Sequence, residues 1–317
     1  LSDEKITKTN PSPDYYVYSF VLENNNIIYG GDFNYSNFKY RSYLGLLTND
    51  DGTAGDWDPQ PNSYVYDIAY NTENVFAAGL FDNVGGAARY GAASFKLKNG
   101  NRNKWNPNLT NNGNPSSADC YAIAATDSYV YIGGNYNGVD GNTRNFISKV
   151  NQQNANVESW DPNLNSYPQV IAINNDDVAV GGNFTFGKYR QRSYLASLDL
   201  NTGYANDWNP QPDSYVFDIA LNYNRVFAAG QFDNVAGIQH SGAVSFNLNS
   251  GDLLTWNPQL SRSGQYYLAD LNAVYADSNN VYLGGHFDQV AGTTRYNAAA
   301  VATANNAALQ SWDPSPS

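Results

Sequence analysis

Six Trp-Asx-Pro motifs divide this 317-residue chain into units of nearly constant length. Every tryptophan of the protein belongs to such a motif, and successive tryptophans are 48, 55, 48, 48 and 56 residues apart. The six are Trp57, Trp105, Trp160, Trp208, Trp256 and Trp312. A repeat of this period is typical of solenoids, propellers and arrays, and it explains how one domain can extend over so many residues.

Each unit contains the same short alternating runs in the same order. A run such as YVYDIA at 64–69 follows the proline, and a second run ends in Gly-Gly or Ala-Gly. A third run leads through a turn into a fourth strand, which carries the next tryptophan. Alternating runs between Gly, Asn and Asp turns predict a four-stranded antiparallel meander, and no segment has sustained helical periodicity. Six such sheets arranged radially make a six-bladed β-propeller, whose closure removes the apolar end faces of a linear stack.

The chain also repeats itself on a longer scale. WDPQPNSYVYDIA at 57–69 returns as WNPQPDSYVFDIA at 208–220, and the two longer units, the third and the sixth, occupy the same place in each half. A tandem duplication of a three-blade segment explains both observations. We therefore expect one all-β domain over residues 14–317, with blades at about 14–57, 58–105, 106–160, 161–208, 209–256 and 257–312.

Residues 1–13 form an N-terminal leader that the six blades do not need. This leader can be disordered, can add an outer strand to the last sheet, or can add to the exposed sheet edge of a neighbouring molecule. The third arrangement would create open, heterologous contacts and hence filaments.

The composition argues against several classes of partner. The net charge is −12 and no Lys/Arg cluster is present, so we expect neither nucleic acid nor an anionic membrane surface as a partner. No run of 18 apolar residues is present, which argues against membrane insertion. The single cysteine, Cys120, excludes an internal disulfide and is expected to be a small buried side chain. The chain has no methionine, not even at position 1. Removal of a signal peptide, or another trimming of the chain, would produce such a start.

The repeat resembles a known family. The phrase Val-Tyr-x-Gly-Gly-x-Phe, followed by Gly-x-x-Arg-x-x-x-Ala and Gly-x-x-x-x-Trp-Asn-Pro, resembles the delta-60-type β-propeller repeats of secreted and surface bacterial proteins. It is also similar to propeller regions of fungal cortical-marker proteins. The resemblance covers residues 14–317 and implies a propeller that is secreted or displayed on the cell surface. Most such domains have no assigned activity, so the resemblance implies little about function.

Two residue types recur in the same register and have structural explanations with functional alternatives. The tryptophans are expected to pack between blades; the alternative is sugar stacking, as in propeller lectins. A repeated arginine is expected to tie each blade to the next by hydrogen bonds to carbonyls or to the Asx of the Trp motif; the alternative is anion binding. The arginines are Arg41, Arg89, Arg144, Arg192 and Arg295, with His240 in the fifth unit.

One position between the glycine pair and the next aromatic residue differs from unit to unit. It holds Asp32, Leu80, Asn135, Asn183, Gln231 and His286. If these side chains converge on the channel or on one rim, they can bind a cation or a small polar ligand, whereas the alternative is a set of solvated strand residues. The candidate binding residues are Asp32, Asn135, Asn183, Gln231 and His286.

No catalytic constellation is recognisable in the sequence. The chain has two histidines and lacks a nucleophile elbow, a zinc-spaced histidine pair and a phosphate loop, so we expect no enzymatic activity and no cofactor. The loop at 49–56 lacks the alternating ligands and terminal Glu of a Ca²⁺ site, so Ca²⁺ is only a weak alternative to a turn there. Asn34, Asn108 and Asn183 begin Asn-x-Ser/Thr acceptors for glycosylation.

These observations predict a non-enzymatic extracellular structural or adhesive module. Its many Asn and Tyr residues suit contacts with a protein partner or with copies of itself, in filaments or a surface layer. The first alternative is a propeller that binds a glycan or a small ligand at the channel rim. The second is a metal-dependent hydrolase of the lactonase type, which would bind calcium and turn over esters or lactones.

Overall fold

The computed structural model describes residues 13–24, 26–36, 39–48, 55–174, 176–188, 190–263 and 269–314, so that residues 1–12 of the expected leader lie outside this part. The chain divides into two compact units, residues 1–163 (unit 1) and 164–317 (unit 2). Each unit contains three main antiparallel sheets. In these ranges the helical structure is one 3₁₀ turn, Pro115–Ser117, and no helix is long and apolar enough to cross a membrane.

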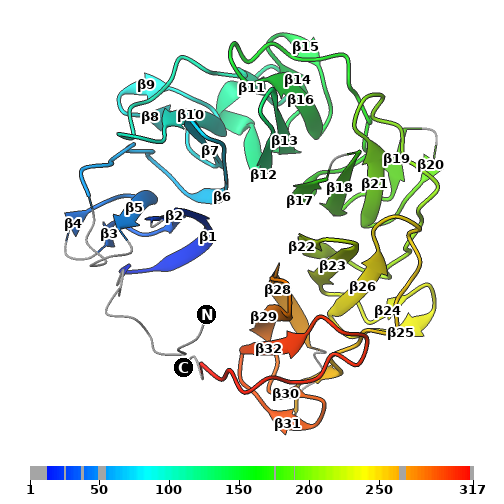
Figure 1. Ribbon diagram of the computed structural model, residues 1–317. Coiled ribbons are helices and arrows are strands. Elements are labelled where there is room, and N and C mark those ends of the chain that lie inside the picture. The colour runs from blue at the N-terminus through cyan, green and yellow to red at the C-terminus, as the bar shows by residue number, and fades with distance from the viewer. Residues whose placement is uncertain are drawn as a thin grey trace. The chain divides into compact units, whose positions relative to one another are not determined.

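Unit 1 is a series of three meanders, and the second strand of each meander lies in the middle of its sheet (Figure 1). The strands are β1 (Tyr16–Glu23), β2 (Asn26–Asp32) and β5 (Leu44–Thr48); β6 (Val65–Tyr70), β7 (Asn74–Gly79) and β10 (Ala92–Lys96); and β12 (Asp119–Ala125), β13 (Tyr129–Asn135) and β16 (Ile147–Asn151). The first strands are neighbours, because β6 lies against β1 and against β12.

Unit 2 repeats this plan. Its strands are β17 (Pro168–Ile173), β18 (Asp177–Gly182) and β21 (Leu195–Asp199); β22 (Val216–Asn222), β23 (Arg225–Gly230) and β26 (Ala243–Asn247); and β28 (Asp270–Ala276), β29 (Asn280–His286) and β32 (Ala298–Ala302). Here β22 lies against β17 and against β28. The predicted all-β meanders are therefore present in both units.

The prediction of four hydrogen-bonded strands in each blade is wrong for the described residues, because the main sheets have three strands there. The segment before the tryptophan joins its sheet through a single bridge, as between Phe95 and Arg102. The chain leaves the sheet here because the tryptophan reaches the next one: Trp105 Nε1 donates to the Asn151 carbonyl oxygen of β16 at 3.0 Å. The proline two residues later has no N–H with which to continue a ladder.

The polar segments between the second and third strands form small outer hairpins rather than open loops. Four of them have two strands: β3 (Tyr35–Ser36) with β4 (Lys39–Tyr40), β8 (Asn83–Val84) with β9 (Ala87–Ala88), β19 (Phe186–Gly187) with β20 (Arg190–Gln191), and β24 (Asn234–Val235) with β25 (Ile238–Gln239). In the two longer units a third strand joins: β11 (Leu109–Thr110) with β14 (Gly138–Val139) and β15 (Asn142–Thr143), and β27 (Leu260–Ser261) with β30 (Gln289–Val290) and β31 (Thr293–Thr294).

The second glycine of the pair is required inside its own sheet. A Cβ on Gly79 would lie 2.0 Å from the Tyr64 carbonyl oxygen, and a Cβ on Gly230 would lie 2.0 Å from that of Tyr215. The first strand of every main sheet has a β-bulge at this place, between residues such as Val65 and Asp67. The bulge brings backbone against backbone, and only a residue without a side chain fits.

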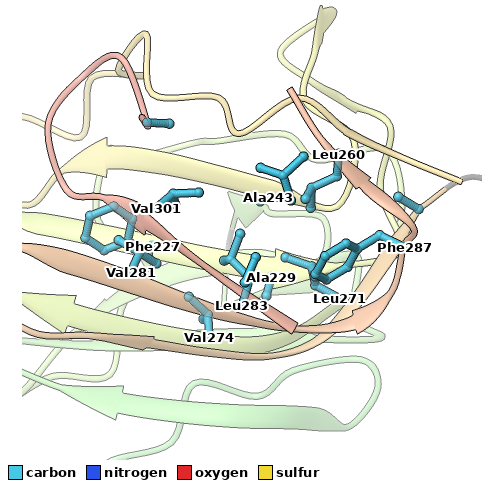
Figure 2. Close-up of a cluster of buried hydrophobic side chains, with 14 of the residues drawn as sticks. Phe227, Ala229, Ala243, Leu260, Leu271, Val274, Val281, Leu283, Phe287 and Val301 are labelled. Carbon is cyan, nitrogen blue, oxygen red and sulfur yellow. The ribbon is translucent and has the colours of Figure 1, made fainter. Parts of the chain in front are cut away.

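The core consists of apolar side chains packed between successive sheets. Figure 2 shows Phe227 and Ala229 of β23 in one cluster with Leu271 and Val274 of β28. Trp256 is fully buried in the same cluster. Each sheet therefore supplies one side of an apolar layer and needs a neighbour to supply the other.

Candidate functional site

The β-bulges of unit 1 place three tyrosines in contact with one another. Tyr18, Tyr66 and Tyr121 are the bulged residues of β1, β6 and β12. The ring centroids of Tyr18 and Tyr66 are 5.5 Å apart, and those of Tyr66 and Tyr121 are 5.7 Å apart. A bulge takes its residue out of the strand alternation and re-aims the side chain, which is common beside binding sites. Three sheets thus contribute to one row of rings.

Further tyrosines widen this row into a continuous surface. Tyr64 lies 6.4 Å from Tyr18 and 5.9 Å from Tyr43, and Tyr16 stacks on Tyr18 at 6.3 Å between ring centroids. We name the set the tyrosine face: Tyr15, Tyr16, Tyr18, Tyr43, Tyr64, Tyr66 and Tyr121. Tyr15, Tyr16 and Tyr18 are 57%, 60% and 45% exposed, so part of this aromatic surface is open to solvent. Exposed contiguous aromatic surface commonly marks a site of interaction.

Two carboxyl groups adjoin the tyrosine face. Burial, followed by the charge of Asp32, raises the pKa of Tyr18 and of Tyr43, which places this carboxylate beside both phenols. At the other end of the row, burial raises the pKa of Asp119, and the Tyr121 hydroxyl donates to Asp119 Oδ2 at 3.4 Å. A neutral phenol can stack on the ring of a ligand and donate a hydrogen bond to one of its hydroxyl groups. A neighbouring carboxylate can accept a hydrogen bond from such a hydroxyl group.

The variable position of each unit lies near the end of the second strand, opposite the start of the first. In unit 1, Asp32 pairs with Tyr16 and adjoins the tyrosine face. Asn135 pairs with Asp119, and its Oδ1 accepts a hydrogen bond from Asn111 Nδ2 at 3.4 Å.

In unit 2 the variable position has other side chains with other partners. His286 Nδ1 lies 2.7 Å from Asp270 Oδ1, and the His286 side chain is 56% exposed. The backbone N–H groups of Asn183 and Gln231 donate hydrogen bonds to the carbonyl oxygens of Tyr167 and Tyr215, respectively. The five candidate residues therefore occupy equivalent places within each unit, and Asp32 is the one that adjoins an extended aromatic surface.

The bulge tyrosines and Asp119 were missed by sequence reasoning, which treated them as ordinary members of alternating strands. A signal was present in the duplication. In unit 2 the register of Tyr18, Tyr66 and Tyr121 holds Gln169, Phe217 and Asn272. Aligning the two halves would have singled out these positions as places where the copies differ while their packing residues agree.

The guanidinium groups of the repeated arginines donate hydrogen bonds to backbone carbonyl oxygens of their own unit. Arg192 Nη1 donates to the Gln191 carbonyl oxygen and Nη2 to that of Asn206, each at 2.7 Å. Arg41, Arg89 and Arg144 make the same two types of contact, and Arg295 Nη1 donates to the Thr294 carbonyl oxygen. Arg41 and Arg295 also approach Asp58 and Asp313 of the Trp motifs, at 3.6 and 3.4 Å. The carbonyl contacts join an outer hairpin to the segment before the tryptophan of the same unit, whereas the contact between Arg41 and Asp58 reaches the residue that begins the next blade.

The tryptophans lie mainly in the core. Trp57, Trp105, Trp160 and Trp256 are at most 4% exposed, so their rings are covered by protein, whereas Trp208 and Trp312 are half-buried. His240, in the register of the arginines, is 4% exposed, burial lowers its pKa, and its Nδ1 has no hydrogen-bond partner in the described part of the chain.

Several further predicted features can be placed. Within the described ranges, no group of three His, Cys, Asp or Glu side chains could hold a metal ion. Of the loop at 49–56, residues 49–54 lie outside those ranges. Cys120 is fully buried, and burial raises the pKa of its thiol. Among the glycosylation acceptors, Asn34 and Asn108 are exposed and Asn183 is half-buried.

Comparison with protein-family models and with curated proteins finds no match, so the likeness to delta-60-type repeats stays a resemblance. Solved structures do match. The extracellular domain of a B. thetaiotaomicron protein described as a one-component system is 14% identical, with a TM-score of 0.53 over 90% of this chain and 32% of that one. The WD40 β-propeller domain of Doa1 is 12% identical (TM-score 0.55; 85% and 75% covered).

A chain from the mitotic checkpoint complex is 13% identical, with a TM-score of 0.55 over 85% of this chain and 72% of that one. This chain spans about a third of the length of the B. thetaiotaomicron protein. At such identities the likeness shows the fold alone. The protein has an all-β, β-propeller-like fold.

Proposed function

We propose that this protein is a non-enzymatic extracellular adhesion module that binds a hydroxyl-rich glycan on its tyrosine face. The observation that carries the proposal is the row of Tyr18, Tyr66 and Tyr121 at three successive β-bulges. Aromatic rings stack on the C–H face of a sugar ring, while phenols and the carboxyl groups of Asp32 and Asp119 exchange hydrogen bonds with its hydroxyls. The extracellular placement is in keeping with the B. thetaiotaomicron neighbour, which is an extracellular domain.

Binding without chemistry is proposed because no catalytic arrangement accompanies the tyrosine face. The described residues contain no cluster of three metal-binding side chains. Stacking of several rings in one row can supply the affinity of an adhesion module by itself.

A glycan array tests the proposal, followed by calorimetry with the retained glycans. Tyr18→Ala and Tyr66→Ala should each weaken binding by about tenfold, which corresponds to about 1.4 kcal/mol of lost stacking. Tyr223→Ala is the matched control, because Tyr223 is 85% exposed and lies in unit 2, outside the tyrosine face. Retention of no glycan by the intact protein, or equal binding by all three variants, would refute the proposal.

We also infer that the six sheets close into one ring, the six-bladed propeller over residues 14–317. Val17 and Phe20 of β1 are 39% and 60% exposed, although Val65 and Ile68, the residues of the same register in β6, are buried against the first sheet. A Cβ on Gly30 would lie 2.5 Å from Val65 Cγ1, so that layer is tightly packed. The repeat therefore leaves one apolar layer open at β1.

The last sheet has side chains at the positions that cover the equivalent layer in other sheets. In unit 2, Leu271 and Val274 pack against Phe227 and Ala229 of the preceding sheet. The residues equivalent to Phe227 and Ala229 in β29 are Tyr282 and Gly284, and both are half-buried. In the six-bladed ring that we propose, a sheet of the same chain covers the layer at Val17 and Phe20. The alternative occupant is a second copy, which would make self-assembly the function.

Light scattering of wild type and Phe20→Arg separates these arrangements. Ring closure predicts a monomer of 34.8 kDa for both proteins, with a lower melting temperature for the variant. Larger wild-type assemblies that Phe20→Arg dissolves would instead place the contact between copies. Ile238→Arg is the control, since Ile238 is 56% exposed on an outer hairpin. A monomeric wild type whose melting temperature Phe20→Arg leaves unchanged would contradict both arrangements.

A further inference from the structure

One core position differs in unit 2 from its counterparts. In four sheets an aromatic residue at the start of the glycine-pair run packs edge-on against the tryptophan, with ring centroids 5.0–5.4 Å apart. The four pairs are Phe76–Trp105, Tyr131–Trp160, Phe227–Trp256 and Tyr282–Trp312. The first sheet has Ile28 in this register, and the fourth has Ala179. In this register the fourth sheet therefore offers Trp208 one methyl group, and the indole packs edge-on against Phe246 of the next sheet instead, with ring centroids 5.1 Å apart.

A cavity of about 240 Å³ lies beside Trp208. Ala179, Ser197 and Val226 contribute to its wall, with Asp177, Asn206 and the turn at 247–251 around them. Trp208 is half-buried, and its Nε1 donates to the Gly251 carbonyl oxygen at 2.8 Å. We name this cavity the Trp208 pocket.

The equivalent space in unit 1 is filled. Ile28 and Leu46 stand in the registers of Ala179 and Ser197, and both pack in the cluster that contains Trp57, which is 4% exposed. Trp57 Nε1 donates to the Lys96 carbonyl oxygen, whereas the carbonyl in that register of unit 2, Asn247, is not the acceptor for Trp208. The two copies therefore differ by loss of side-chain volume in unit 2 and by a displaced indole.

A carboxylate is set into the Trp208 pocket. Asp177 is half-buried, and burial raises its pKa, while the polar side chains of Asn206 and Ser197 lower it in part. Asn206 Nδ2 donates to Ser197 Oγ at 2.7 Å, which holds these two side chains in place. Asp207 lines the pocket as well, but it is exposed and pairs with Arg190. No lysine or arginine is among the lining residues, so Asp177 lies beside the indole with no basic side chain in the wall.

We propose that the Trp208 pocket binds a small aryl-alkyl ammonium ion. The ring of this ligand takes the position that corresponds to the Phe76 ring in the second sheet, and its ammonium group pairs with Asp177. Phe76 and Trp105 show the edge-on geometry that the ligand ring would adopt against Trp208. A charge-assisted hydrogen bond to a cationic partner stabilises a half-buried carboxylate. The ammonium group can also make a cation–π contact with the indole of Trp208. The site is separate from the tyrosine face, and its test does not depend on glycan binding.

Calorimetry with phenethylamine as the probe tests this site. Asp177→Asn should weaken binding at least tenfold, and Ala179→Phe should abolish it by filling the pocket. Both substitutions introduce the residue that sheet two already has in that register, Asn74 and Phe76, so both variants are expected to fold. Asp127→Asn, on the surface of unit 1, makes the same charge change as a control and should leave binding unaltered.

Three results would overturn the assignment. Saturable binding of phenethylamine that Ala179→Phe leaves intact would place the ligand elsewhere. Equal affinity for phenethyl alcohol, which has the ring without the charge, would remove the role of Asp177. Absence of saturable binding by wild type, or binding of glucose in place of the amine, would refute the ligand class. If Ala179→Phe does not fold, Asp177→Asn and the neutral alcohol decide between these outcomes.

Discussion

Asp218 joins two neighbouring sheets of unit 2 through backbone N–H groups that the sheets themselves do not use. Its Oδ1 accepts the N–H of Ile219 at 2.8 Å, and its Oδ2 accepts the N–H of Val274, in β28, at 2.7 Å. Both N–H groups lie next to β-bulges, where the ladder is interrupted. In unit 1, Asp67 accepts the N–H groups of Ile68 and Ile123 in the same manner.

Asp218→Ala leaves both N–H groups without an acceptor. Each unsatisfied group costs about 1–3 kcal/mol, and since the site is half-buried we take the lower end, a loss of about 2 kcal/mol at neutral pH. Burial raises the pKa of Asp218 to about 6 from 3.8. At about 1.4 kcal/mol per pH unit this is a ceiling of ~3 kcal/mol, which solvent screening at a half-buried site reduces to ~1–2 kcal/mol.

The sign of the pH dependence follows from proton binding. The folded state holds the Asp218 proton more tightly than the unfolded chain does, so the free energy of unfolding contributed by Asp218 falls as pH rises from about 4 to about 6. The loss caused by Asp218→Ala should therefore be larger at about pH 4 than at about pH 7. Urea unfolding of wild type and variant at both pH values measures this difference, with Asp127→Ala as the surface control. A loss that grows with pH, or one below about 0.5 kcal/mol at both values, would refute the reasoning.

Two further predictions concern the repeat itself. Gly79→Ala should lower the free energy of unfolding by more than about 2 kcal/mol, because its Cβ would lie 2.0 Å from the Tyr64 carbonyl oxygen. Gly55→Ala, whose nearest contact would be 4.0 Å away, should change it by less than about 1 kcal/mol. Urea unfolding compares the two variants, and similar losses would contradict the steric explanation. His240→Arg should raise the melting temperature and stabilise the protein by about 1 kcal/mol, because arginine in this register donates to two carbonyl oxygens, whereas Nδ1 of His240 has no partner among the described residues. Calorimetry checks this, and a lower melting temperature would show that the space around His240 cannot accept the longer side chain.

The strand plan could be predicted from the sequence because it depends on local patterns. Alternating runs, Gly pairs and Trp-Asx-Pro motifs recur in each unit, and each corresponds to a strand, a bulge contact or a buried indole. The fourth strand could not be predicted correctly, since the polar segment before Trp105 has the same sequence whether it pairs along its length or through one bridge. What ends the pairing is the reach of Trp105 to the Asn151 carbonyl, which is a tertiary contact.

The tyrosine face was harder to predict for a related reason. Tyr16, Tyr18, Tyr64 and Tyr66 alternate with valine, so periodicity assigns them to one solvated strand face. A bulge shifts the register by one residue, and nothing in YVY specifies on its own that the second tyrosine is the bulged one. The variable position was identified because its residue type changes, yet its partners across the sheet, Asp119 and Asp270, follow from the bulge register.

The duplication supplies an internal control for which differences matter. Residues that pack between sheets agree between the copies: Val65 and Ile68 correspond to Val216 and Ile219, and all four are buried. The copies diverge at Tyr18, Tyr66 and Tyr121, where aromatic rings are concentrated in unit 1, and at Ala179 and Ser197, where volume is removed in unit 2. A change that merely relaxed packing would be expected to destabilise unit 2 without adding polar chemistry. The loss of volume instead coincides with a half-buried carboxylate, Asp177, in the wall of the Trp208 pocket, which agrees with the binding site that we propose there.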